Sequence, residues 1–244
     1  MTFRKQNGGF GLVEIMIALL LGLVLVLGIV QIFSSTRQTA LVQDASAGLQ
    51  EDARYVLTRM TQELRMAGMF GCLSLNSASV SGVPDEFDSP IRWEAGSTSL
   101  LIITSNATRG VAESTNADWT LVTDCRTTGA VVPGVAVPGN GEMAFPIRQT
   151  EYQLDPDRNV LQVRNGGAGS FEPLVGNVKS FDVQFGVAAN AGDPYVSGNY
   201  VAPGTVANPA LIRSVRIALV LEDENQRSAP QEYTVVAALR NRLL

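Results

Sequence analysis

The feature that most constrains this chain is an apolar run of 24 residues, Phe10 to Phe33, that carries one charge, Glu14. As a helix the run is long enough to span a hydrocarbon core of about 30 Å. A carboxylate at the centre of a membrane helix costs about 2.5–3.5 kcal/mol, so a segment that only had to sit in lipid would not carry one. Arg4 and Lys5 precede the run and only Arg37 follows closely, which predicts a cytoplasmic amino terminus.

Two simple interpretations leave part of this pattern unexplained. A secretory signal peptide would place Glu14 inside its apolar region. Its small-residue cleavage site would have to be residues 45–47 (ASA), more than ten residues beyond the end of the apolar run. A plain membrane anchor accounts for the length and apolarity of the run, but not for Glu14 or for the Gly9–Phe10 junction.

The junction itself resembles a known signal. Residues 8–14 (GGFGLVE), followed by the apolar run, are similar to the class III signal of type IV prepilins and pseudopilins. The resemblance implies cleavage after Gly9 by a prepilin peptidase, N-methylation of the new terminus at Phe10, and pairing of Glu14 with the terminal ammonium of a neighbouring subunit. That pairing makes physical sense, because a buried carboxylate becomes tolerable once a partner charge compensates it. The helix lacks the internal proline of many major pilins, which favours a minor subunit.

Helical periodicity continues past the membrane run. An apolar stripe recurs at three- and four-residue spacing in Leu49, Ala53, Val56, Met60, Leu64 and Ala67. Charged residues lie mostly away from it: Glu51, Asp52, Arg54, Arg59, Glu63 and Arg65. Gly68 and Gly71 supply a stop signal, so we expect one helix from Phe10 to about Met66 whose stripe packs on a sheet. Gly22 and Gly28 would permit close approach of a second helix in the membrane half.

The rest of the chain predicts an antiparallel sheet. Period-two alternation and buried runs indicate strands at 99–104, 151–154, 160–164, 178–187, 211–221 and 232–239. The turn at 155–158 (DPDR) joins the second and third of these as a hairpin. Loops are expected at 72–98, 106–116, 127–141, with 131–137 extended, and 188–209. A long helix followed by strands indicates an α+β fold.

Four short segments extend the resemblance over nearly the whole chain. They are residues 67–72 (AGMFGC), 174–178 (LVGNV), 214–217 (SVRI) and 239–242 (LRNR). Their order resembles the PilW family of minor pilins. In that family these segments are mostly structural, so the resemblance makes Arg240 and Arg242 surface or helix-contact residues without catalytic roles.

Composition narrows the possible functions. The chain has no histidine, the commonest general base and metal ligand, and only two cysteines, Cys72 and Cys125. We therefore expect no enzyme, no metal site and no cofactor. A net charge of −5 and the absence of a dense basic run argue against direct nucleic-acid binding. Beyond a membrane segment, two cysteines favour one disulfide in an oxidising compartment; two separate buried thiols are the alternative.

These observations divide the chain into a leader at 1–9, a transmembrane assembly helix at 10–33, an amphipathic extension at 34–71 and a periplasmic head at 72–244. The resemblance implies a minor pilin in the inner membrane, incorporated into a type IV pilus and supporting motility, adhesion or DNA uptake. Its partners would be the prepilin peptidase, other minor pilins and the major pilin through their helices, and the assembly platform. A type II secretion pseudopilin is the alternative, and a membrane-anchored periplasmic binding protein is a distant one.

Overall fold

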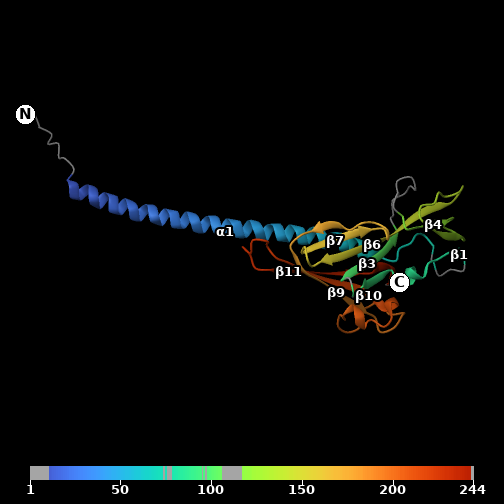
Figure 1. The fold of residues 1–244 in the computed structure, drawn as a ribbon. Helices are drawn as coiled ribbons and strands as arrows, with labels where there is room; N and C mark the ends of the chain where they lie inside the picture. Colours follow the sequence, from blue (N-terminus) through green and yellow to red (C-terminus); the bar gives the residue numbers. More distant parts are fainter. Residues whose placement is uncertain are drawn as a thin grey trace, which may run out of the picture. The chain divides into compact units, whose positions relative to one another are not determined.

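The computed structural model describes residues 11–73, 75, 79–94, 96, 98–105 and 117–242. One helix, α1 (Leu12–Met66), opens the described chain (Figure 1) and ends where the periodicity predicts. The chain divides into two compact units between Ala47 and Gly48. The first unit contains helix alone among its described residues, and the second contains the last part of α1 and every described strand.

The larger sheet of the second unit has eight described strands, in the order β1-β5-β4-β6-β3-β2, with β7 paired to β6 and β8 paired to β7. All pairs are antiparallel except β1 with β5. The strands are β1 (Val80–Ser81), β2 (Ile91–Glu94), β3 (Ser99–Ser105), β4 (Trp119–Thr123), β5 (Gly129–Pro133), β6 (Met143–Asp155), β7 (Val160–Asn165) and β8 (Glu172–Val175). The predicted hairpin between β6 and β7 is present, with Asp155 opposite Val160.

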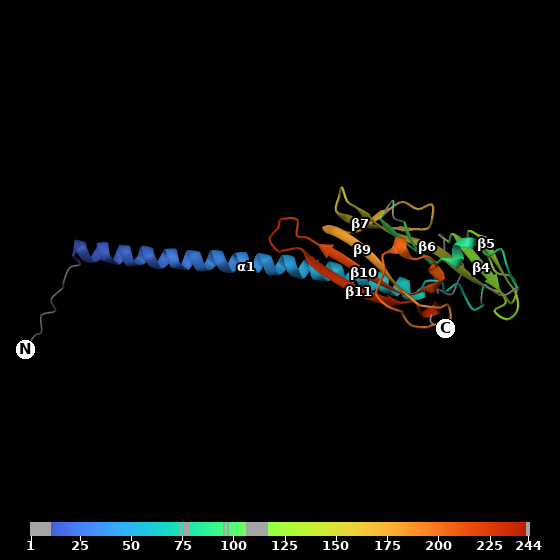
Figure 2. The same ribbon diagram turned by 90° about the horizontal axis from the view of Figure 1, so that it is seen from below.

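The smaller sheet is antiparallel, in the order β11-β10-β9, and consists of β9 (Val178–Val187), β10 (Ile212–Leu221) and β11 (Gln231–Ala238). Its strands show the predicted alternation, because Phe181, Val183 and Phe185 of β9 are buried while Asp182 and Gln184 are exposed. Short 3-10 helices lie at Asp85–Asp88, Pro203–Thr205, Pro209–Leu211 and Arg240–Arg242. Figure 2 shows β9, β10 and β11 side by side along the last part of α1.

One hydrophobic core joins both sheets to the helix within the second unit. Every residue of the predicted stripe is buried: Leu49, Ala53, Val56, Met60, Leu64 and Ala67. These side chains share a cluster with Leu100 and Ile102 of β3 and with Val215, Ile217 and Leu219 of β10. The prediction that the stripe faces a sheet is therefore confirmed. A second cluster, centred on Phe70, Phe87 and Leu121, fills space on the opposite face of the larger sheet.

The helix ends through a glycine in the left-handed region. Gly68 has φ +75°, a conformation that costs little without a Cβ, and its amide donates to the carbonyl of Ile103 at 3.1 Å. Two residues further along β3, Ser105 N donates to Met69 O at 2.7 Å. The chain leaving α1 is thus hydrogen-bonded directly to β3, the strand that the stripe covers.

The sequence-based strand assignments were incomplete. Strands β1 and β2 lie inside the expected loop 72–98, and β4 and β8 were not predicted. Strand β5 (129–133) lies in the expected loop 127–141 and overlaps the stretch 131–137 that was expected to be extended. Strand β6 is 13 residues long, whereas only 151–154 was expected. Most of these strands are short, and β6 carries Pro146 and residues of mixed polarity, so none shows a clear apolar period. They form through pairing with neighbouring strands. The expected loop at 106–116 lies outside the described residues.

Candidate assembly segment

The first half of α1 presents apolar side chains to its surroundings over its whole circumference. The large side chains between Leu12 and Phe33 are each more than half exposed. By length and composition the helix is able to cross a membrane. In water such a surface would be strongly unfavourable, so this segment requires lipid or other apolar helices around it.

Glu14 lies in the first turn of this segment and is exposed. Its amide and that of Ile15 donate to the Gly11 carbonyl at 3.0 and 3.2 Å. Among the described residues, its carboxylate has no hydrogen-bonding or ion-pair partner. Gly9 and Phe10, the predicted cleavage and methylation residues, lie outside the described residues, so the pairing of Glu14 with an amino terminus stays a prediction.

Two glycines within the helical part of the apolar segment, Gly22 and Gly28, leave open space on the helix surface. A Cβ built on Gly22 or Gly28 would meet nothing within 4 Å. A neighbouring helix would be able to approach there more closely than over leucine. Their role as helix contacts stays a prediction.

In the second unit, a polar contact attaches α1 to the larger sheet. The hydroxyl of Tyr152 on β6, fully buried, donates to Glu63 Oε2 at 2.7 Å. Arg59 Nε donates to the other carboxylate oxygen at 3.3 Å. Burial and the neighbouring Glu63 carboxylate raise the pKa of Tyr152 well above its ordinary value, so the phenol stays neutral and acts as a donor.

The sequence pattern placed Arg59 and Glu63 away from the apolar stripe and did not predict this contact. Both are half-buried beside β6. Helical periodicity does not predict the contact, because a carboxylate at the border of the apolar stripe is assigned to solvent unless its partner is known. The one indication of such a contact was Tyr152, which is among the largest buried side chains. A buried phenol usually needs a hydrogen-bond acceptor.

Cys72 and Cys125 form a disulfide, with Cα atoms 5.5 Å apart. The bridge links the segment after α1 to the turn after β4 and spans 53 residues, which is worth about 4 kcal/mol in the chain-entropy model. The turn is held by Asp124, whose carboxylate accepts from the amides of Thr128, Arg126 and Thr127. These hydrogen bonds hold the pKa of Asp124 far below its ordinary value.

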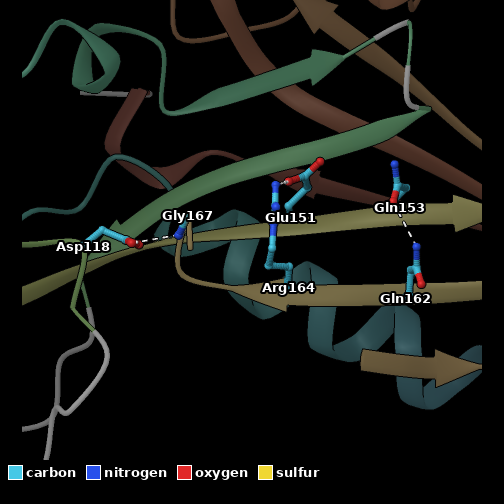
Figure 3. A network of polar contacts seen from close by, with 6 residues as sticks. All are labelled: Asp118, Glu151, Gln153, Gln162, Arg164 and Gly167. Carbon is cyan, nitrogen blue, oxygen red and sulfur yellow. Dashed lines mark hydrogen bonds and ion pairs between the residues drawn. The ribbon is translucent and has the colours of Figure 1, made fainter. Parts of the chain in front are cut away.

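Polar side chains also connect β6 and β7 (Figure 3). Glu151, which is buried, pairs with Arg164, and Gln162 donates to Gln153 at 2.9 Å. Asp118, just before β4, accepts from Gly167 N at 2.8 Å and from Gln149 N at 2.9 Å. These contacts tie the β7–β8 loop to the start of β4.

The segments that resemble the PilW family have structural positions. Leu239 N donates to Arg213 O at 2.9 Å, and Asn241 Nδ2 donates to the Ala67 carbonyl at 3.3 Å, so the carboxyl-terminal segment contacts the end of α1. The contact comes from Asn241 rather than from its neighbour Arg240, which is exposed. The side chain of Arg242 lies outside the described part of the chain.

The described residues contain no group of three or more His, Cys, Asp or Glu that could hold a metal ion. Asp223 pairs with Arg227, whose Nε lies 2.9 Å from its carboxylate. Hydrogen bonds from the Arg227 side chain and amide lower the pKa of Asp223 to about 2. This pair closes the loop between β10 and β11 and is a structural contact.

Comparison with known proteins identifies the amino-terminal segment. Residues 4–30 match the family model described as the prokaryotic N-terminal methylation motif. No curated protein matched the chain. The motif, together with an α+β fold of the type IV pilin kind, supports a type IV pilin or pseudopilin and implies processing by a prepilin peptidase and incorporation into a filament with other pilins. It points to a structural subunit.

Proposed function

We propose that this protein is a minor pilin of the PilW kind, which takes part in type IV pilus assembly as a component of the priming or tip complex. The observation that carries the proposal is Glu14 in an apolar helix inside a methylation motif. The apolar surface suits two environments, lipid before assembly and a bundle of like helices afterwards. The leader 1–9, the membrane segment 10–33 and the periplasmic head are the proposed parts of the precursor.

Energetics favour an assembly role for Glu14 over a local one. An acid in the first turn of a helix gains about 0.3–1 kcal/mol from the helix dipole. Burial at membrane depth costs about 2.5–3.5 kcal/mol, so the local gain does not compensate for it. A terminal ammonium from a neighbouring subunit would supply the missing compensation, and it would also determine how far along the filament axis that neighbour sits.

Two sequence features favour a minor pilin over a major one or a pseudopilin. The helix from Leu12 to Met66 contains no proline, and the four PilW-like segments run in order through the head. The structure is compatible with a structural role for these segments, since those at 67–72 and 239–242 contact each other. A type II secretion pseudopilin shares the leader and the helix, and it is the alternative that the experiment has to separate.

The test replaces Glu14 and uses a matched acid as control. Glu14→Ala should leave membrane insertion and removal of the leader intact but exclude the protein from sheared pili. Glu51→Ala removes an exposed acid from the same helix, outside the apolar run, and should be incorporated as the wild type is. Mass spectrometry of the mature protein should show a methylated Phe10. Normal incorporation of the Glu14→Ala protein would refute the pairing role.

Deletion of the gene with two readouts separates the candidate functions. Loss of surface pili with normal protein secretion supports the minor pilin. Loss of secretion with normal piliation would instead assign the protein to a type II secretion system. An intact leader in cells with an active prepilin peptidase would overturn both functions.

A further inference from the structure

The head contains a polar cleft of about 300 Å³ between the end of α1 and the larger sheet, here called the Arg148 cleft. Its walls come from four elements: α1, the end of β3, the middle of β6 and the end of β7. The side chains that matter are Arg59, Glu63, Thr104, Arg148, Thr150 and Asn165. All of them belong to the second unit and are fully described.

The cleft occupies core-facing positions of the sheet. On β3 and β6 the pairs opposite each other run from Leu100 with Tyr152, through Ile102 with Thr150, to Thr104 with Arg148. Because alternate residues share a face, these pairs all lie on the face that α1 covers. Along these pairs the core side chains are replaced first by Thr150 and then by Thr104 and Arg148. Apolar residues would have continued the core there, so the polar set is not required by packing.

Several polar groups in the cleft lack partners. Thr150 and Thr104 are both more than nine-tenths buried, and the Thr104 hydroxyl already donates to the Ser105 carbonyl at 2.9 Å, so it is left to accept from a ligand. No hydrogen bond or ion pair joins the side chains of Arg148, Thr150 or Asn165 to another described residue. Buried polar groups in folded proteins are nearly always satisfied, so the buried Thr150 favours a polar ligand in the cleft. Arg148 is partly buried and Asn165 is exposed, so both are accessible to such a ligand.

The charged side chains of the cleft determine what charge its ligand should carry. Arg59 is already paired with Glu63, so the uncompensated charge is the single guanidinium of Arg148. A guanidinium binds a carboxylate through two parallel hydrogen bonds. A dianion such as phosphate would leave one negative charge without a partner in this cleft, so a monoanion matches it better. The threonine hydroxyls and the Asn165 amide match hydroxyl groups on the ligand.

We propose that the Arg148 cleft binds a small monoanionic carboxylate that also carries hydroxyl groups, the chemistry of a hydroxy acid or of an acidic monosaccharide. Arg148 holds the carboxylate, while Thr104, Thr150 and Asn165 bind the hydroxyls. A volume near 300 Å³ lies at the small end of ligand sites and suits one such molecule. This site is separate from the assembly segment and does not depend on the proposed function.

The test is calorimetric titration of the full mature chain in detergent micelles with D-galacturonate, and separately with D-gluconate. Saturable binding of either acid is expected. Neutral D-galactose and inorganic phosphate serve as probes of charge and should bind more weakly. Removing the guanidinium in Arg148→Gln should weaken binding about 10- to 100-fold, the usual effect of losing a hydrogen bond to a charged group. Arg158→Gln, an exposed arginine in the β6–β7 turn, should bind as the wild type does.

The variants also separate binding from folding. Arg148→Lys keeps the charge but not the paired donors, so its affinity should fall between those of the wild type and Arg148→Gln, and thermal melts should show both variants folded. If Arg148→Gln fails to fold, the Arg148→Lys comparison carries the test. No saturable binding of either acid, equal binding of galactose, tighter binding of phosphate, or unchanged affinity in both Arg148 variants would overturn the proposal.

Discussion

The buried contact between Tyr152 and Glu63 gives a quantitative prediction about how the helix is held on the head. Tyr152→Phe removes the hydroxyl and keeps the ring that packs in the core. The lost interaction is one hydrogen bond of 2.7 Å from a fully buried phenol to a carboxylate. The carboxylate keeps Arg59, and its side chain is 20% exposed, so water replaces part of what is lost.

The magnitude follows from these contacts. Hydrogen bonds to charged groups contribute about 1.5–3 kcal/mol, and partial rehydration of Glu63 reduces the expected loss for Tyr152→Phe to about 1–2 kcal/mol. Glu63→Ala leaves the buried phenol without its acceptor and should cost more, about 2–3 kcal/mol. For a domain of this size 1 kcal/mol corresponds to about 2–4 °C, so the melting temperature of Tyr152→Phe should fall by about 2–8 °C.

The assay is urea and thermal unfolding of the mature protein in detergent, for both single variants and the double variant. If the two side chains interact as the structure shows, the double-mutant cycle should give a coupling free energy of about 1–2 kcal/mol. Tyr195→Phe, which alters an exposed tyrosine, is the control and should unfold as the wild type does. A coupling free energy below about 0.5 kcal/mol would refute the role of this contact.

The same contact predicts a pH dependence. Burial raises the pKa of Tyr152 in the folded protein above its ordinary value of 10.0, whereas an unfolded chain ionises near that value. A raised pKa in the folded state means that the contribution is fully present below about pH 10 and is lost as the pH rises further. The alkaline decline in the free energy of unfolding should therefore be steeper in the wild type than in Tyr152→Phe. Equal slopes would contradict the assignment.

Two further predictions concern the head. Gly186→Ala should destabilise it by about 1–3 kcal/mol, because a Cβ there would overlap Ser214 Oγ and lie 2.8 Å from Val196 Cγ2. The control for urea unfolding is Gly176→Ala, whose added Cβ meets nothing within 4 Å. Equal unfolding midpoints for the two variants would argue against tight packing at Gly186. The pKa of Asp223 is lowered to about 2 from 3.8, so its contribution to the free energy of unfolding is present above about pH 4 and is lost as the pH falls toward 2. Asp223→Asn should therefore flatten the decline in the free energy of unfolding between about pH 4 and 2. An unchanged decline would show that the pair with Arg227 does not contribute to stability.

Much of the fold follows from local patterns in the sequence. The stripe from Leu49 to Ala67 and the stop at Gly68 predict where α1 ends, and strict alternation predicts β9 with both of its ends correct. These elements are predictable because each buries one face, which fixes the period of its apolar residues. Strands β2, β4 and β8 lack a clean period and form through pairing with neighbours, which no local window contains.

The same division holds for the sites. Glu14 and its apolar run predict an assembly segment from sequence alone, because the cost of a charge at membrane depth can be recognised without tertiary context. Arg148, Thr150 and Glu63 are unremarkable in sequence, and their spacing along the chain gives no sign that they share a cleft. Only β6 lying between β3 and β7 beneath α1 brings them together, since the register of paired strands, rather than local sequence, determines which distant side chains meet.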